Sequence, residues 1–338
     1  MQRVGKSLSY GIGILFLVLI AVITLTIGWR PFIGPKARPL TSRKFEVTPQ
    51  RLQRGKYLFI GLAGCAGCHS PHDWKSHGAP IPAGAEGSGE IMPLNDAPGT
   101  IVAPNLTPDV ETGSGSWTDD QLARSIREGI GHDGRTLFPM MPYDRFRTMS
   151  DEDLASIVVY VRSLPAVRNP LPKSSIDFPV KYLIRMVPQP VNGPVAGPDP
   201  KNQLQVGAYL TNIADCAFCH TPVDSHQQPL PGLDFAGGQV FSGAFGKIAS
   251  ANITPDATGI SYYDETLFLQ ALKTGYVKAR SLNSLMPYGD FQHATDEDLK
   301  AIFVYLRTLK PVKHYVDNSE PPTYCKVCKQ KHGGGDRN

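Results

Sequence analysis

The sequence contains the pattern C-x-x-C-H twice, as Cys65-Ala-Gly-Cys68-His69 and as Cys216-Ala-Phe-Cys219-His220. This pattern is typical of c-type haem attachment, in which the two cysteines form thioether bonds to the haem. The adjacent histidine then binds the iron from one side. We therefore predict two covalently bound haem c groups, with His69 and His220 as axial ligands and with four attachment cysteines, Cys65, Cys68, Cys216 and Cys219.

A zinc site built from the same four cysteines is the alternative interpretation. The long separation of the two pairs, and the histidine directly after each pair, fit that interpretation poorly. The chain has 338 residues, which is enough for two domains of ordinary size. Its 34 basic residues nearly balance 30 acidic ones, and no basic run occurs, so we expect no nucleic acid among its partners.

The amino-terminal region carries no charge between Lys6 and Arg30. A helix over residues 7–29 would rise about 34 Å at about 1.5 Å per residue, which is enough to span a bilayer. A cleaved signal peptide is the alternative, but the apolar run is longer than such peptides need and no A-x-A-like site follows it. We therefore predict an uncleaved single-pass transmembrane helix, with the lipid bilayer as a partner, in the inner (cytoplasmic) membrane of a bacterium.

The orientation of this predicted anchor follows from two conflicting signals. More basic residues follow the span than precede it, which by itself would place the carboxyl side in the cytoplasm. Haem attachment to C-x-x-C-H takes place outside the bacterial inner membrane, and we give that argument more weight. The haem domains are thus predicted to lie in the periplasm or outside, after a proline-rich stalk over residues 30–49.

Much of the remaining sequence occurs twice. The paired segments are Asn105-Leu-Thr-Pro-Asp109 with Asn252-Ile-Thr-Pro-Asp256, Met141-Pro142-Tyr143 with Met286-Pro287-Tyr288, and Asp151-Glu-Asp153-Leu154 with Asp296-Glu-Asp298-Leu299. We predict a tandem repeat of two haem domains, over residues 50–168 and 202–313. A proline-rich linker over residues 169–201 joins them, and a tail with a third C-x-x-C pair follows over residues 314–338.

Each copy is predicted to close with a helix. Ser150 and Thr295 suit helix N-caps, each with an acidic residue three positions later. Apolar residues then recur at helical spacing, as Leu154, Ile157, Val158, Val161 and Leu164 and as Leu299, Ile302, Phe303, Leu306 and Leu309. We interpret these stripes as ordinary core packing. The segments before the two haem motifs, residues 50–62 and 203–213, are also expected to be helical.

The sixth coordination position of each iron either takes a second ligand or stays open for small-ligand chemistry. A Met-Pro-Tyr segment follows each haem motif, and its proline stiffens the loop that presents the methionine. We therefore predict Met141 and Met286 as the second axial ligands, with Met140 as a competitor that lacks the Pro-Tyr context. The unrepeated histidines are expected at the surface or in loops, with His132 able to approach the first haem: His72, His77, His132, His226, His293 and His314.

The third pair, Cys325-Lys-Val-Cys328-Lys329, lacks the histidine. It resembles the lysine-ligated haem site of multihaem nitrite reductases over five residues, but the glycine-rich end of the tail cannot supply a haem pocket alone. A third haem at Cys325 and Cys328 is therefore disfavoured. A disulfide, a metal site completed by His332 or by a partner, and a tail without function remain open.

From Gln50 to Val312 the chain resembles the tandem cytochrome c domains in the cytochrome subunits of bacterial membrane-bound alcohol, aldehyde and gluconate dehydrogenases. The resemblance rests on the two haem motifs, the Asn-[Leu/Ile]-Thr-Pro-Asp segments, the Met-Pro-Tyr segments and the Asp-Glu-Asp-Leu helices. It implies a mainly α fold with two class I cytochrome c domains, a periplasmic location and His/Met ligation. It also implies that the Asn-x-Thr-Pro-Asp loops line the haem edges or the domain contact. Those subunits usually carry three haem domains, whereas this chain has two.

The leading functional hypothesis is a membrane-anchored dihaem electron carrier of a respiratory chain, without catalytic residues of its own. Electrons would come from a dehydrogenase or a quinol-oxidising complex, and would leave for a soluble cytochrome, a terminal oxidase or another terminal acceptor. The alternative is a dihaem redox enzyme of the peroxidase or thiosulfate dehydrogenase type. A peroxidase needs a haem with an open or displaceable ligand, and the Met-Pro-Tyr segment in both halves argues against it.

Overall fold

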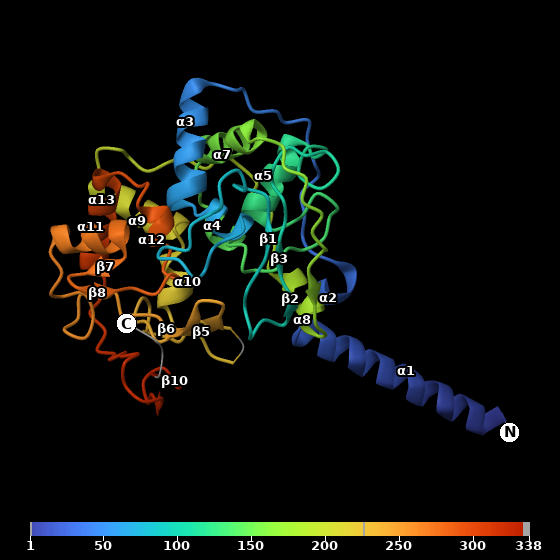
Figure 1. The fold of residues 1–338 in the computed structure, drawn as a ribbon. Helices are drawn as coiled ribbons and strands as arrows, with labels where there is room; N and C mark the ends of the chain where they lie inside the picture. Colours follow the sequence, from blue (N-terminus) through green and yellow to red (C-terminus); the bar gives the residue numbers. More distant parts are fainter. Residues whose placement is uncertain (1, 226, 334–338) are drawn as a thin grey trace.

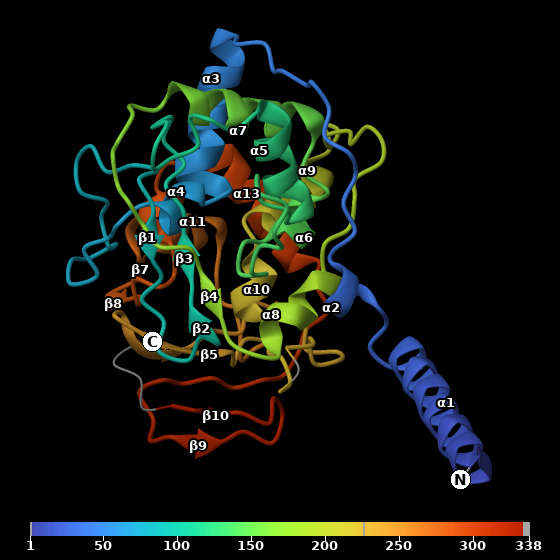
Figure 2. The same cartoon turned by 90° about the vertical axis from the view of Figure 1, so that its right-hand side faces the viewer.

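The computed structural model describes residues 2–225 and 227–333, with side chains from Gly11 onward, and shows a mainly helical molecule (Figures 1 and 2). The helices up to the middle of the chain are α1 (Gln2–Leu25), α2 (Arg30–Ile33), α3 (Pro49–Tyr57), the π-helical turn η1 (Leu58–Leu62), α4 (Cys65–His69), α5 (Asp119–Glu128), α6 (Tyr143–Phe146) and α7 (Asp151–Ser163). They are followed by α8 (Val180–Leu183), the 3-10 turn η2 (Ile184–Met186), α9 (Gln203–Ile213), α10 (Cys216–His220), α11 (Glu265–Thr274), α12 (Tyr288–Phe291) and α13 (Asp296–Arg307).

The strands of the described chain are short and pair antiparallel, two at a time. The pairs are β1 (Glu90–Ile91) with β3 (Val102–Ala103), β2 (Gly99–Thr100) with β4 (Ser175–Ile176), β5 (Val240–Gly243) with β6 (Gly246–Ala249), β7 (Tyr276–Val277) with β8 (Arg280–Ser281), and β9 (Thr323–Tyr324) with β10 (Lys331–His332). Because none of them extends into a larger sheet, the strands shape loops and the core belongs to the helices.

Two helix crossings hold the core, α3 with α7 and α9 with α13 (Figure 1). A glycine lies at each crossing. A Cβ atom on Gly55 would lie 2.0 Å from the Ser156 carbonyl oxygen, and one on Gly207 would lie 1.9 Å from that of Ala301. Only glycine allows the backbones to approach so closely. We call residues 50–168 the first half and residues 202–313 the second half.

The closing helices agree with the sequence prediction. The Ser150 hydroxyl accepts a hydrogen bond from the Asp153 amide at 3.0 Å, and the Thr295 hydroxyl accepts one from the Asp298 amide at 3.2 Å. These contacts cap α7 and α13. The acidic residues in the first turn of each helix also stabilise it, because they lie near the positive end of the helix dipole. The two predicted apolar stripes are buried up to Leu164 and Leu306, with Leu309 partly buried against the core. The helices predicted before the haem motifs are also confirmed, as α3 with η1 and as α9.

The two halves meet through reciprocal contacts. The Tyr57 hydroxyl donates to the Asp298 carboxylate at 2.5 Å, and the Tyr209 hydroxyl donates to the Asp153 carboxylate at 2.6 Å. Each tyrosine thus reaches the first turn of the other half's closing helix. Likewise α6 packs on α9 while α12 packs on η1, so each half lays its short helix beside the other half's haem motif.

The chain between α2 and α3 lies along α5. The Arg38 guanidinium contacts the Asp120 carboxylate at 2.7 Å and the Glu128 carboxylate at 2.8 Å, and both acidic side chains are almost fully buried. The Phe45 amide also donates to Asp119 at 3.0 Å. Residues 38–45, which the sequence assigned to a stalk, therefore cover part of the first half.

The predicted membrane anchor is corrected by the structure. α1 points away from the body of the molecule (Figure 1), but among the described residues no helix has both the length and the apolar character needed to cross a membrane. The predicted span starts at Ser7, and its side chains before Gly11 lie outside the described part of the chain. The predicted single-pass span over residues 7–29 and the inner-membrane localisation are therefore not supported.

Candidate haem sites

Each C-x-x-C-H motif forms a short helix whose start is a sharp turn. Gly64, before α4, and Asp215, before α10, have positive φ angles of 57° and 48°. This turn directs both cysteines and the histidine of a motif to the wall of one cavity. The first cavity, of 1070 Å³, contains Cys65, Cys68 and His69, and the second, of 1940 Å³, contains Cys216, Cys219 and His220.

The two histidines are oriented in the same way. The Nδ1 of His69 lies 2.8 Å from the Pro104 carbonyl oxygen, and the Nδ1 of His220 lies 2.7 Å from that of Ala251. Because Nδ1 donates its hydrogen to the carbonyl, Nε2 keeps a free lone pair. Burial lowers the pKa of both imidazoles, which favours the neutral form. A neutral imidazole with its second nitrogen hydrogen-bonded is the usual state of a metal ligand.

The carbonyl groups that orient these histidines belong to the repeated asparagine loops. The Asn105 side chain accepts from the Thr107 amide at 2.9 Å and donates to the Val167 carbonyl at 2.7 Å. Asn252 makes the matching bonds, to the Thr254 amide at 2.9 Å and to the Val312 carbonyl at 2.8 Å. Both asparagines are buried. The loops therefore fix the carbonyls of the preceding residues, and Asn252 itself borders the second cavity.

The predicted methionines lie in the same two cavities. Met141 lines the first cavity together with Met140, and Met286 lines the second. The backbone around them is equivalent, because the Tyr143 amide donates to the Met141 carbonyl and the Tyr288 amide donates to the Met286 carbonyl, each at 2.8 Å. Each tyrosine ring packs against a glycine with a φ of +69°, Gly129 or Gly275, where a Cβ atom would lie 2.6 Å from the ring. The Met-Pro-Tyr loops are thus held in place by packing.

Comparison with known proteins agrees with this geometry. Residues 52–165 match the family model described as cytochrome c. They are a cytochrome c domain. The chain is 29% identical to the fructose dehydrogenase cytochrome subunit of Gluconobacter japonicus, over 81% of this chain and 56% of that protein. It is 31% identical to the cytochrome c subunit of the quinone alcohol dehydrogenase of Gluconacetobacter polyoxogenes, over 77% of this chain and 56% of that protein.

The chain is also 24% identical to a diheme cytochrome c-type protein of Cereibacter sphaeroides, over 91% of this chain and 99% of that protein. It therefore spans about half the length of the dehydrogenase subunits, and nearly all of the diheme protein. These three relatives, and the gluconate 2-dehydrogenase cytochrome c subunit of Pantoea cypripedii, are named as cytochromes or as cytochrome subunits of dehydrogenases. The chain carries covalently bound haem c, as the motifs predict.

The cysteines of both motifs fit a covalently held haem. Burial raises the pKa of all four thiols to about 12, so the thiolate form is disfavoured at these positions. A thioether sulfur carries no charge, and its burial costs correspondingly little. Histidine, methionine and cysteine are ordinary haem attachments and axial ligands, and the two cavities bring all three types together.

The two haem motifs of this chain lie close to each other across the contact between the halves. Cys68 and Cys219 both border the first cavity, as do Asp215 and Asp290. A Cβ atom on Gly67 would lie 2.4 Å from the Asp290 carboxylate. Arg145 occupies the equivalent place in the other half, 3.5 Å from Asp215. Burial raises the pKa of both Asp215 and Asp290 to about 7.

Several residues beside the cavities were not singled out by sequence reasoning. Arg135 borders the first cavity and Arg280 the second, and their positions match in the paired sequence segments. The constant spacing of the repeat could have indicated this pair. His132 was expected to approach the first haem, and it borders the first cavity, stacked on Trp117 at 4.2 Å between ring centroids. His226, which was expected in a loop, lies outside the described residues.

Proposed function

We propose that the chain is a dihaem electron-transfer cytochrome built from two tandem cytochrome c domains, residues 50–168 and 202–313. One observation carries the proposal. Each cavity holds the same set of groups: two cysteines of one helix, a histidine whose Nδ1 is tied to a carbonyl, and the methionine of a Met-Pro-Tyr loop. The match of the diheme relative over nearly the whole chain supports the count of two haems.

The residues that would hold the first haem are Cys65, Cys68, His69 and Met141, and those for the second are Cys216, Cys219, His220 and Met286. When bound, the haem supplies a reversible one-electron change at its iron. The carbonyls of Pro104 and Ala251 keep each imidazole in one orientation. Met141 and Met286 would supply the second ligand of each haem iron, which would leave no open position for peroxide and would favour electron transfer over catalysis.

The proximity of the two motifs supports transfer between the two sites. Cys68 and Cys219 line a common cavity, and the short helices α6 and α12 hold the two halves in this register. Arg135 and Arg280 would place positive charge near each haem. The names of the dehydrogenase relatives support a dehydrogenase as electron donor, with a further respiratory protein as acceptor.

The test is a haem count with spectra of the purified full chain. We expect two haems per chain by pyridine haemochrome, and low-spin spectra with the weak sulfur-to-iron band at the red end. Rapid turnover of peroxide, or a high-spin haem, would contradict the carrier function and favour a peroxidase. Affinity purification from the native cell should recover a dehydrogenase subunit. If no such subunit is recovered, the proposed donor is wrong while the carrier function stands.

A further inference from the structure

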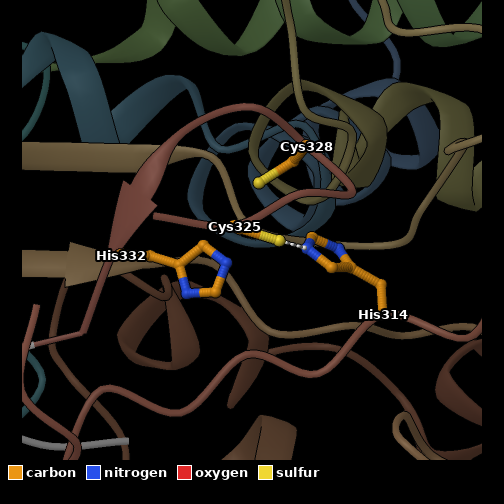
Figure 3. A group of neighbouring side chains, drawn as sticks. All are labelled: His314, Cys325, Cys328 and His332. Atoms are coloured by element: carbon orange, nitrogen blue, oxygen red, sulfur yellow. Dashed lines mark hydrogen bonds between the residues drawn. The ribbon is translucent and has the colours of Figure 1, made fainter. Parts of the chain in front are cut away.

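The carboxyl-terminal tail brings together two cysteines and two histidines that the haem sites do not use. Figure 3 shows His314, Cys325, Cys328 and His332 directed toward a common centre. One ligand atom of each residue lies within 4.8 Å of every other. Sequence reasoning placed His314 in a loop or at the surface; it lies in a loop, and this residue is only 1% exposed.

The β9–β10 hairpin supplies three of the four side chains. Cys325 and Cys328 lie in its turn, and His332 lies on β10. The Val327 amide donates to the Cys325 Sγ at 3.4 Å, and the Lys329 amide donates to the Cys325 carbonyl at 3.0 Å. These bonds fold the turn back on itself, so the two sulfur atoms face the same side.

Both histidines direct one ring nitrogen toward the centre. The Nδ1 of His314 donates to the Ala236 carbonyl at 2.8 Å, and its Nε2 lies 3.3 Å from the Cys325 Sγ. The Nε2 of His332 is buried and has no hydrogen-bond partner among the described residues. A buried polar atom without a partner is costly, which points to a ligand that completes it.

We propose that His314, Cys325, Cys328 and His332 bind one zinc ion. A tetrahedral site with Zn–S bonds of about 2.3 Å and Zn–N bonds of about 2.0–2.1 Å places neighbouring ligand atoms about 3.3–3.8 Å apart. The observed cluster needs only small movements to reach that geometry. Two sulfur and two nitrogen ligands in a tetrahedron select zinc, and four protein ligands leave no open position, so the site is structural.

Other uses of the Cys325–Cys328 pair agree less well with these contacts. A Cys325–Cys328 disulfide would leave the Nε2 of His332 without a partner. A third haem would have no histidine next to Cys328, where Lys329 stands. A two-iron cluster needs its ligands divided between two separate irons, whereas these four atoms surround one point.

The zinc would fasten the tail to the loop behind the second haem motif. His314 bonds to Ala236, and the next residue, Gly237, donates its amide to the His220 carbonyl at 2.7 Å. Gly238 has a φ of +89°, and a Cβ atom there would lie 2.5 Å from the His314 ring and 3.3 Å from the Cys328 Sγ. The glycine therefore makes room for the site.

The experiment measures metals in the purified full-length holoprotein by inductively coupled plasma mass spectrometry. We expect one zinc and two irons per chain. Cys325→Ser and His332→Gln should lose most of the zinc while retaining two haems, and Lys326→Gln, an exposed position in the same turn, should retain both metals. X-ray absorption at the zinc edge of the wild type should show two sulfur and two nitrogen neighbours, and this readout does not depend on how the variants fold.

Four results would overturn the proposal. The first is the absence of zinc together with the absence of a titratable thiol, which indicates a disulfide. The second is a count of three haems per chain, and the third is iron or copper in place of zinc at these four residues. The fourth is zinc that is retained in both variants. The haem count of the variants tests the dihaem function separately, because the haems and the zinc use different cysteines. A failed zinc proposal therefore leaves the proposed dihaem function unaffected.

Discussion

At the scale of single residues, the two haem sites depend on groups that are not among the predicted haem ligands. The carbonyl oxygens of Pro104 and Ala251 orient the histidines, and Asn105 and Asn252 hold the loops that present these carbonyls. The sequence indicated that these loops matter, because they are repeated. It could not show that a main-chain oxygen is the acting group, since every residue has one.

The choice of axial methionine is tested by substitution. Met141→Ala and Met286→Ala should each lower the midpoint potential of one haem, because loss of the thioether removes a ligand that favours reduced iron. The measurement is a potentiometric titration followed in the visible spectrum. Met140→Ala is the matched control and should leave both potentials unchanged. A shift in Met140→Ala alone would make Met140 the ligand of the first haem.

At the scale of elements, the crossings of α3 with α7 and of α9 with α13 were only half predictable. Helical spacing identified the buried faces of the closing helices, and the caps at Ser150 and Thr295 were correct. The crossing partner was not predictable, because two glycines within helical segments carry no signal of what packs against them. The contact between backbones appears only when both helices are in place.

The glycine at the second crossing predicts a loss of stability. In Gly207→Ala the new methyl group would meet the Ala301 carbonyl, so the helices must separate. We expect a loss of about 1–3 kcal/mol in the free energy of unfolding, the usual range for overpacking. Thermal denaturation of the holoprotein measures it, with Gly197→Ala as control, where a Cβ atom meets only ordinary contacts. An unchanged midpoint in Gly207→Ala would show that the crossing tolerates side chains.

At the scale of the whole molecule, the relation between the halves was beyond sequence reasoning. The repeat predicted two similar units joined by a linker, but not that each unit packs beside the haem motif of the other. Tyr57 and Tyr209 look like ordinary amphipathic residues until the opposite half supplies Asp298 and Asp153. The tail shows the same difficulty, because His314 joins Cys325 and Cys328 only through the folded hairpin.

The buried contact between the halves predicts a pH dependence. Asp290 titrates near 3.8 in the unfolded chain and near 7 in the folded protein, because burial disfavours its charged form. Between these values the unfolded chain has released the proton and the folded protein still holds it, so stability falls as pH rises through this window. Below pH 4 both states are protonated and the full stability remains.

Asp290→Asn should therefore unfold at a higher temperature than the wild type at pH 8 and should show a flatter profile between pH 5 and 7. Thermal denaturation of the holoprotein across this range measures the difference. Asp177→Asn, at an exposed position, serves as the control and should follow the wild-type profile. A wild-type profile in Asp290→Asn would mean that another group controls the slope.

The reciprocal tyrosine contacts have one more consequence. In a symmetric dimer, residue i of one subunit meets residue j of the other, and j meets i in return; such an interface is called isologous. The two halves of this chain meet in that way, although a single polypeptide connects them. Either half produced alone would expose a self-complementary surface, and we expect it to pair with a second copy of itself.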